Sequence, residues 1–200
     1  MPMNRTDKLL ALVRELGVLR PRDLDAHGIP RIYLKLAVEQ KLVEQAGRGL
    51  YRLASAEATE HQALIECAKR VPNGVVCLLS ALQFHGLTTQ LPADLWLAIE
   101  ERAWRPKLDY PPLRVVYFSG KALTEGVETH VIQKVPVRVY SAAKTIADCF
   151  KYRKKVGLDV CMEALRDGWR QKKAKADDLW HFGKVCRVSN VMRPYLESLV

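Results

Sequence analysis

Apolar residues near the start of the chain recur at the spacing of an amphipathic helix. The positions that share one helical face are Leu9, Leu10, Leu12, Val13 and Leu16. Thr6 and Asp7 precede them and are typical N-cap residues, while Gly17 suits the position just after a helix. The pattern therefore predicts a first helix of about three turns.

Proline and glycine divide the following residues into two shorter helices. Pro21 suits the first position of a second helix that Gly28 ends, and Pro30 begins a third helix that runs to about Gln40. One side of the third helix is apolar, with Leu34, Val38 and, beyond the helix, Leu42. The residues expected on its exposed sides are Arg31, Tyr33 and Lys35.

A β-hairpin is predicted next. Two β-prone runs, 42–46 and 50–53, flank the turn Gly47-Arg48-Gly49, which places Arg48 at the tip and Arg52 on the second strand. Helix, short helix, turn, helix and hairpin follow one another in the order of a winged helix-turn-helix. In that module the third helix enters the major groove, and a wing arginine contacts the phosphate backbone or the minor groove.

The candidate DNA-binding residues are Arg31, Tyr33, Lys35, Arg48 and Arg52. Many winged helices bind no DNA, so the alternative is a packing or protein-interaction module built from the same elements.

The middle of the chain mixes helices and strands. Residues 56–70 and 78–85 have helical spacing, and the first of these helices would connect two halves of the protein. Short β-prone runs at 95–99, 113–118, 129–132 and 137–140 predict an antiparallel or mixed sheet. The basic loop 100–112 carries Trp104, which we expect to fold onto the sheet; the alternative is that the loop contacts nucleic acid.

The last sixty residues are predicted to be helical. The expected helices are 142–150, capped by Ser141, then 157–171, 177–188 and 189–199. Lys144 and Asp148 are four residues apart, which is typical of an exposed pair on a helix, or of an Asp that caps a neighbouring element.

The fold class is therefore α+β. We expect a winged helix-turn-helix over 1–55, a connecting helix over 56–72, and a mixed α/β domain over 73–200 with a small sheet and C-terminal helices.

Basic charge gathers in two blocks. The net charge of +10 divides into +4 over 1–55, −3 over 56–100 and +9 over 101–200, which favours polyanionic partners such as nucleic acid. Within the last block, a second basic surface of unassigned partner would comprise Lys151, Arg153, Lys154, Lys155, Arg170, Lys172 and Lys173. Apolar runs are far shorter than the roughly 20 residues that cross a bilayer, and no signal peptide is recognised, so we expect a cytoplasmic protein without a membrane partner.

The sequence gives little support to catalysis. Five irregularly spaced cysteines and five isolated histidines predict buried thiols and no metal site. Phosphate-binding and hydrolase motifs are absent, so we expect no catalytic residue, no cofactor and no enzyme. A metal-dependent nuclease remains a third hypothesis; the nearest acidic cluster is Asp94, Glu100 and Glu101 with Lys107.

Four segments of the chain carry a resemblance to a known family. They are 28–44, 47–52 (GRGLYR), 79–88 (LSALxxHGLT) and 139–150 (VYSxxKTxxDxF). Together they resemble the AbiEi antitoxins, the transcriptional-regulator component of type IV toxin–antitoxin and abortive-infection systems.

The resemblance implies an N-terminal winged helix that binds inverted repeats upstream of its own operon and represses it. It also implies a C-terminal domain that opposes a nucleotidyltransferase-like toxin without a stable complex. The alternative is a protein- or RNA-interaction module without repressor function.

Overall fold

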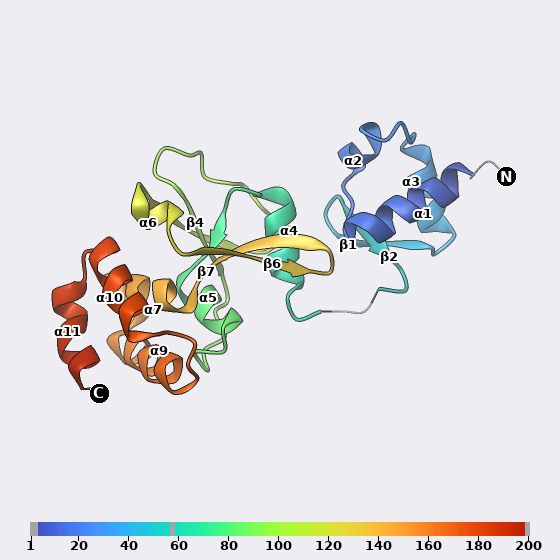
Figure 1. Ribbon diagram of the computed structural model, residues 1–200. Helices are drawn as coiled ribbons and strands as arrows, with labels where there is room; N and C mark the ends of the chain where they lie inside the picture. Colours follow the sequence, from blue (N-terminus) through green and yellow to red (C-terminus); the bar gives the residue numbers. More distant parts are fainter. Residues whose placement is uncertain (1–3, 57–58, 199–200) are drawn as a thin grey trace. The chain divides into compact units, whose positions relative to one another are not determined.

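The computed structural model describes residues 4–56 and 59–198 (Figure 1). The chain forms two compact units. The first comprises Met1–Pro72 and Val131–Val137, and the second comprises Asn73–His130 and Arg138–Val200. Helices and strands are mixed, with a helical and hairpin region at the N-terminus and helices at the C-terminus. The predicted α+β class is therefore confirmed.

The first unit begins with the predicted order of elements. They are α1 (Arg5–Leu16), α2 (Pro21–Asp25), α3 (Ile32–Glu39), β1 (Val43–Gly47), β2 (Leu50–Leu53) and α4 (Gln62–Arg70). The expected caps of α1 were wrong, because Thr6 and Asp7 lie in its first turn. Asn4 takes the N-cap position instead: its backbone is extended, and its carbonyl accepts a hydrogen bond from the Lys8 amide at 3.0 Å.

Two apolar clusters hold the first unit together. The larger joins the three N-terminal helices to the hairpin and includes Leu9, Leu24, Leu34, Ala37 and Val43. The smaller comprises Val18, Leu50, Ile65 of α4 and Val135, so the segment 131–137 completes this core. The smaller cluster therefore packs α4 and the segment 131–137 against Leu50 of the hairpin.

Two sequence predictions in the first unit need correction. Leu42 is 40% exposed rather than part of the apolar face of α3. The reason is that Lys41 adopts a left-handed backbone (φ 56°) just after α3, which takes Leu42 out of the helical register. Helix α4 begins at Gln62 instead of position 56, because Thr59 forms a turn with the Gln62 and His61 amides.

A mixed five-stranded sheet lies at the centre of the chain. Its strands are β3 (Val75–Val76), β4 (Leu95–Glu100), β5 (Leu113–Phe118), β6 (Val127–Ile132) and β7 (Val135–Tyr140), in the order β5-β4-β3-β7-β6. Strand β3 is antiparallel to β4 and parallel to β7, and β4 is parallel to β5. Gln133 and Lys134 join β6 to β7, and both have positive φ, as two-residue hairpin turns require.

The loop after β4 does not behave as predicted. Trp104 is 96% exposed and does not fold onto the sheet. A turn closed by the Ala103 amide on the Glu100 carbonyl (2.9 Å) ends the strand, so Trp104 lies beyond the sheet face that was expected to cover it.

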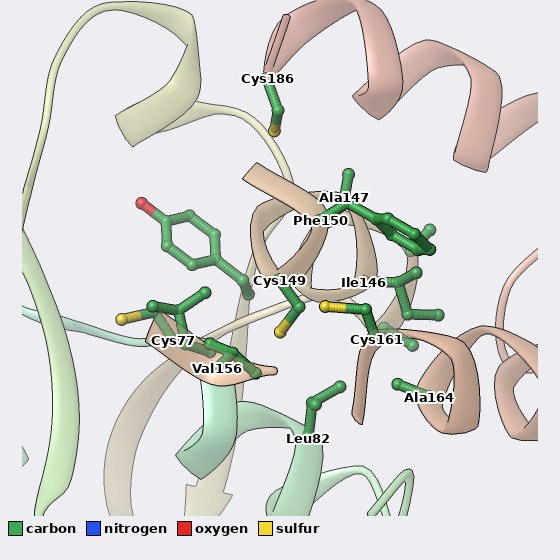
Figure 2. Packing of buried hydrophobic residues seen from close by; sticks show 14 of the residues in the cluster. Cys77, Leu82, Ile146, Ala147, Cys149, Phe150, Val156, Cys161, Ala164 and Cys186 are labelled. Carbon is green, nitrogen blue, oxygen red and sulfur yellow. The ribbon is translucent and has the colours of Figure 1, made fainter. Parts of the chain in front are cut away.

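The central helix of the second unit is α7 (Ala142–Lys151). The other helices of this unit are α5 (Leu78–Phe84), α6 (Lys121–Thr124), α8 (Arg153–Val156), α9 (Leu158–Arg170), α10 (Ala176–Val185) and α11 (Ser189–Glu197). Helix α7 contacts α5, α9, α10 and α11, which gather beside the sheet in Figure 1. Figure 2 shows Ile146, Cys149 and Phe150 of α7 packed among residues of its neighbours. The predicted cap is present, since the Ser141 side chain accepts a hydrogen bond from the Lys144 amide.

Burial of α7 overturns the prediction of an exposed Lys144–Asp148 pair. The two side chains are 0% and 1% exposed, and Lys144 Nζ lies 2.5 Å from Asp148 Oδ2. The ammonium also lies 4.2 Å from the centre of the Tyr140 ring, and Cys186 Sγ donates to Asp148 Oδ1 at 3.1 Å. Burial raises the pKa of Asp148, while the Lys144 ammonium opposes that rise. The pair is an element of the core because four other helices cover α7.

The remaining sequence predictions concern sulfur, metals and membranes. All five cysteines are buried and free, as expected, and four of them lie in the core drawn in Figure 2. Within residues 4–56 and 59–198, no group of three or more His, Cys, Asp or Glu side chains could hold a metal ion. Across the same residues, no helix is long and apolar enough to cross a membrane.

Candidate nucleic-acid interface

Helix α3 presents its polar residues to solvent because its apolar residues anchor it. Leu34 and Ala37 are buried against the other helices of the first unit. This orientation leaves the Arg31 and Lys35 side chains 63% and 74% exposed, and Tyr33 half-buried beside them. The helix therefore has the arrangement that a major-groove recognition helix needs.

Arg31 is oriented by an ion pair with the preceding helix. Its Nη2 lies 2.6 Å from Asp25 Oδ2, and its Nε donates to Asp25 Oδ1 at 3.3 Å. This hydrogen bond lowers the pKa of Asp25. Both groups are exposed, and ion pairs between exposed side chains contribute little to stability. A DNA phosphate can therefore displace the carboxylate while the guanidinium is already directed away from the core.

The exposed side of α3 also carries apolar residues that the sequence analysis did not assign to the site. Ile32 is 54% exposed and Leu36 is 39% exposed, one helical turn apart. Apolar side chains in the major groove contact the thymine methyl group. The same two residues would suit a protein partner, so this face alone does not separate the two kinds of ligand.

The hairpin places its two arginines differently. Arg48 is exposed at the turn between β1 and β2, where Gly49 supplies a left-handed residue (φ 67°). Arg52 lies opposite Glu44 on the paired strands, and its Nε donates to Glu44 Oε1 at 2.7 Å. The Arg52 side chain is only 16% exposed, so its ion pair fixes the strand pairing and leaves Arg48 as the more accessible of the two.

Two residues of helix α4 contact the β1–β2 hairpin, which is the wing of the domain. Arg70 donates a hydrogen bond to the Arg48 carbonyl at the hairpin tip. One turn earlier, the Glu66 carboxylate fits against Gly47, where a Cβ atom would meet Glu66 Oε2 at 2.5 Å. Burial raises the pKa of Glu66, and Gln62 donates to its Oε1 at 3.2 Å. Glu66 and Arg70 thus position the wing.

Sequence reasoning missed this support because the partners are far apart in the chain. The only local signal was the spacing of Glu66 and Arg70, which puts them on one side of a helix. Arg5 was missed for the same reason: its guanidinium lies 5.8 Å from the centre of the Tyr33 ring and adds an exposed cation next to α3.

The second basic surface predicted from the sequence divides into two groups at opposite ends of α9. Lys151, Arg153, Lys154 and Lys155 precede the helix, and Arg170, Lys172 and Lys173 follow at its end. A helix of 13 residues is about 20 Å long, so one small ligand cannot contact both groups. Several of these cations already have protein partners: Arg153 donates to the Phe150 carbonyl, and Lys173 to the His85 carbonyl.

The arrangement of α1 to β2 fits a winged helix-turn-helix, a module that in many proteins places a helix in the major groove of DNA. Residues 7–54 match a family model described as "Transcriptional regulator, AbiEi antitoxin". Residues 7–54 of this chain are therefore similar to the AbiEi antitoxin regulators, and the resemblance inferred from the sequence is confirmed over those residues. The match covers about a quarter of the chain and does not extend to the segments 79–88 and 139–150. A comparison with curated proteins found no match.

Proposed function

We propose that this protein is a DNA-binding autorepressor and antitoxin of a type IV toxin–antitoxin system. It would bind inverted repeats upstream of its own operon through α3 and the wing, and act in the cytoplasm without a cofactor or a catalytic reaction. The observation that carries the proposal is the exposure of Arg31, Lys35 and Arg48 on the two DNA-contacting elements of a regulator-type domain. Tyr33 and Arg52 are proposed as flanking contacts.

DNA binding is tested with the full chain and a duplex that contains the inverted repeat upstream of its operon. We expect the binding constant to fall steeply with salt, since each phosphate contact releases counterions. Arg48→Ala should weaken binding and reduce the salt slope by about 1. The matched control is Arg166→Ala, which removes an exposed cation from the second unit outside both proposed basic surfaces and should leave the slope unchanged. Fluorescence anisotropy over a range of salt concentrations measures both quantities.

Two results would contradict the DNA-binding proposal. One is a lack of binding to any upstream inverted repeat at low salt. The other is an equal loss of affinity in Arg48→Ala and Arg166→Ala, which would assign the affinity to overall charge. The exposed Ile32 and Leu36 favour a protein-interaction module as the second candidate. That candidate gains support if the unchanged chain binds no DNA and Ile32→Ser removes binding to a protein partner.

The antitoxin part of the proposal assigns a separate activity to the second unit. The expected opponent is a nucleotidyltransferase-like toxin encoded next on the same transcript, opposed without a stable complex. Expression of that toxin alone should stop growth, and the full chain should restore it. Arg48→Ala should restore growth as well as the unchanged chain does, because the wing serves the operator and not the toxin. Growth curves and affinity co-purification measure these outcomes; a stable complex, or loss of rescue in Arg48→Ala, would overturn this part.

A further inference from the structure

A cavity of about 500 Å³ opens in the second unit beyond the end of β5. Tyr117 and Phe118 at the end of that strand line it, together with residues at the start of α6 and at the ends of α7 and α10. Strand β5 runs parallel to β4 at the edge of the sheet, and the cavity lies beyond its carboxyl end. The volume of the cavity falls within the roughly 300–1,000 Å³ that is typical of small-molecule binding sites.

Four cations from three helical segments converge on this cavity. They are Lys121, Lys151, Lys184 and Arg187, and no described acidic residue lines it. Lys121 lies 3.6 Å from Glu125. Among residues 4–56 and 59–198, no ion pair involves Lys151, Lys184 or Arg187, although Lys151 lies near enough to the buried Asp148 to lower the pKa of that carboxyl. Several like charges around one space repel each other until an anion neutralises them, so the lining selects a ligand with more than one negative charge.

Helix ends account for only part of this arrangement. Lys151 and Lys184 lie at the carboxyl ends of α7 and α10, where cations are favoured by the helix dipole. Each helix end carries about half a negative charge, which opposes an anion. The three cations outside the Lys121–Glu125 pair still outweigh two such ends. The dipoles also do not explain why cations from separate segments line the same cavity.

Arg187 lines the cavity from an unfavourable backbone conformation. It follows α10 in a left-handed backbone (φ 58°), a position where glycine is the usual residue. This conformation is unfavourable for a residue with a side chain and costs glycine nothing. Lys172 occupies the corresponding position after α9 (φ 57°), is exposed, and lies outside the cavity. Among the described residues, three helix ends thus carry a basic residue in this conformation, namely Lys41 after α3, Lys172 after α9 and Arg187 after α10, and of these Arg187 lines the cavity.

We propose that this cavity binds a nucleotide that carries several phosphates. The four cations would hold the phosphates, and Tyr117, which lines the cavity and is 44% exposed, would stack against the base. The same chemistry is presented by a free nucleoside triphosphate and by the 5′-triphosphate end of an RNA. This inference goes beyond the proposed function and does not depend on it, because the operator is assigned to the first unit.

The test is calorimetric titration of the full chain with ATP, GTP, CTP and UTP, with inorganic tripolyphosphate, and with a 5′-triphosphorylated RNA trinucleotide. We expect saturable binding of one ligand per chain for nucleotides. Arg187→Gly should weaken it about tenfold, the effect of losing roughly one charge-assisted contact. Lys172→Gly is the matched control: it removes one positive charge and relieves the same backbone strain, and it should leave affinity unchanged. Both variants should fold, because glycine suits both positions.

Each outcome has a definite meaning. Tyr117→Ala should weaken nucleotide binding and leave tripolyphosphate binding unchanged; equal affinities for the two ligands in the unchanged chain would overturn the assignment of a base. Tighter binding of the RNA end than of any free nucleotide would support the site and name RNA as the source. Absence of saturable binding at low salt, or an equal loss in Arg187→Gly and Lys172→Gly, would overturn the site. DNA binding by the first unit is measured separately and is unaffected by either result.

Discussion

Replacing Asp148 with alanine is expected to destabilise the second unit by about 3–5 kcal/mol, the cost of leaving a buried charge without its partner. Lys144 is 0% exposed, and its ammonium would face the Tyr140 and Phe118 rings without a carboxylate. Ring contacts of this kind contribute on the order of 1–2 kcal/mol and cannot replace the ion pair. Chemical denaturation followed by far-UV circular dichroism measures the loss.

Two further variants separate the buried charge from ordinary side-chain truncation. Asp167→Ala breaks the exposed Arg170–Asp167 pair in the same unit and should cost well under about 1 kcal/mol. The double variant Lys144→Met/Asp148→Leu removes both charges and should recover most of the stability lost in Asp148→Ala, since apolar replacement of a buried pair is often neutral or favourable. A double variant as unstable as Asp148→Ala would show that packing, not the unpaired charge, sets the cost.

The substitution Gly17→Ala should destabilise the first unit by more than about 2 kcal/mol. Gly17 has a φ of 69°, and a Cβ atom there would lie 1.8 Å from the Gln133 carbonyl oxygen, in the segment 131–137. The nearest Gln133 atoms are its backbone carbonyl oxygen and carbon, which cannot rotate away as a side chain can. The segment would have to leave its place, and with it Val135 would leave the smaller core.

Gly28→Ala is the matched control for this prediction. Gly28 has nearly the same backbone angle (φ 64°), but a Cβ atom there meets nothing within 4 Å. It should therefore show only the conformational cost of about 1 kcal/mol. Thermal unfolding, with limited proteolysis of the segment 131–137, compares the two. Equal destabilisation would contradict the contact between Gly17 and Gln133.

Local patterns predicted those elements whose burial is decided within a few residues. The alternation over 113–118 placed β5 to the residue, and Ser141 marked the start of α7. Strand β3 was missed because two residues carry no periodicity. The Lys144–Asp148 pair was misassigned for a different reason: four-residue spacing is the same on an exposed and a covered helix, and only the packing of α7 separates the two cases.

The residues of the candidate sites also differ in whether local sequence patterns could predict them. The exposed face of α3 and the tip of the wing follow from local spacing and turn residues, so Arg31, Lys35 and Arg48 could be named in advance. The hydrogen bond from Arg70 to Arg48 joins residues 22 positions apart. The cavity needs cations from positions 121, 151, 184 and 187 to meet, and no sequence period connects them. Tertiary structure alone supplies such groups.

The position of residues 131–137 has a consequence for how the protein is made. The larger apolar cluster of the first unit lies entirely before position 54, so it can form early on the ribosome. The smaller cluster needs Val135, which emerges roughly sixty residues after Pro72. At a synthesis rate of about 5–20 residues per second, several seconds pass between the synthesis of Pro72 and that of Val135, which completes the first unit. Its final stability is thus reached only after most of the sheet of the second unit has been synthesised.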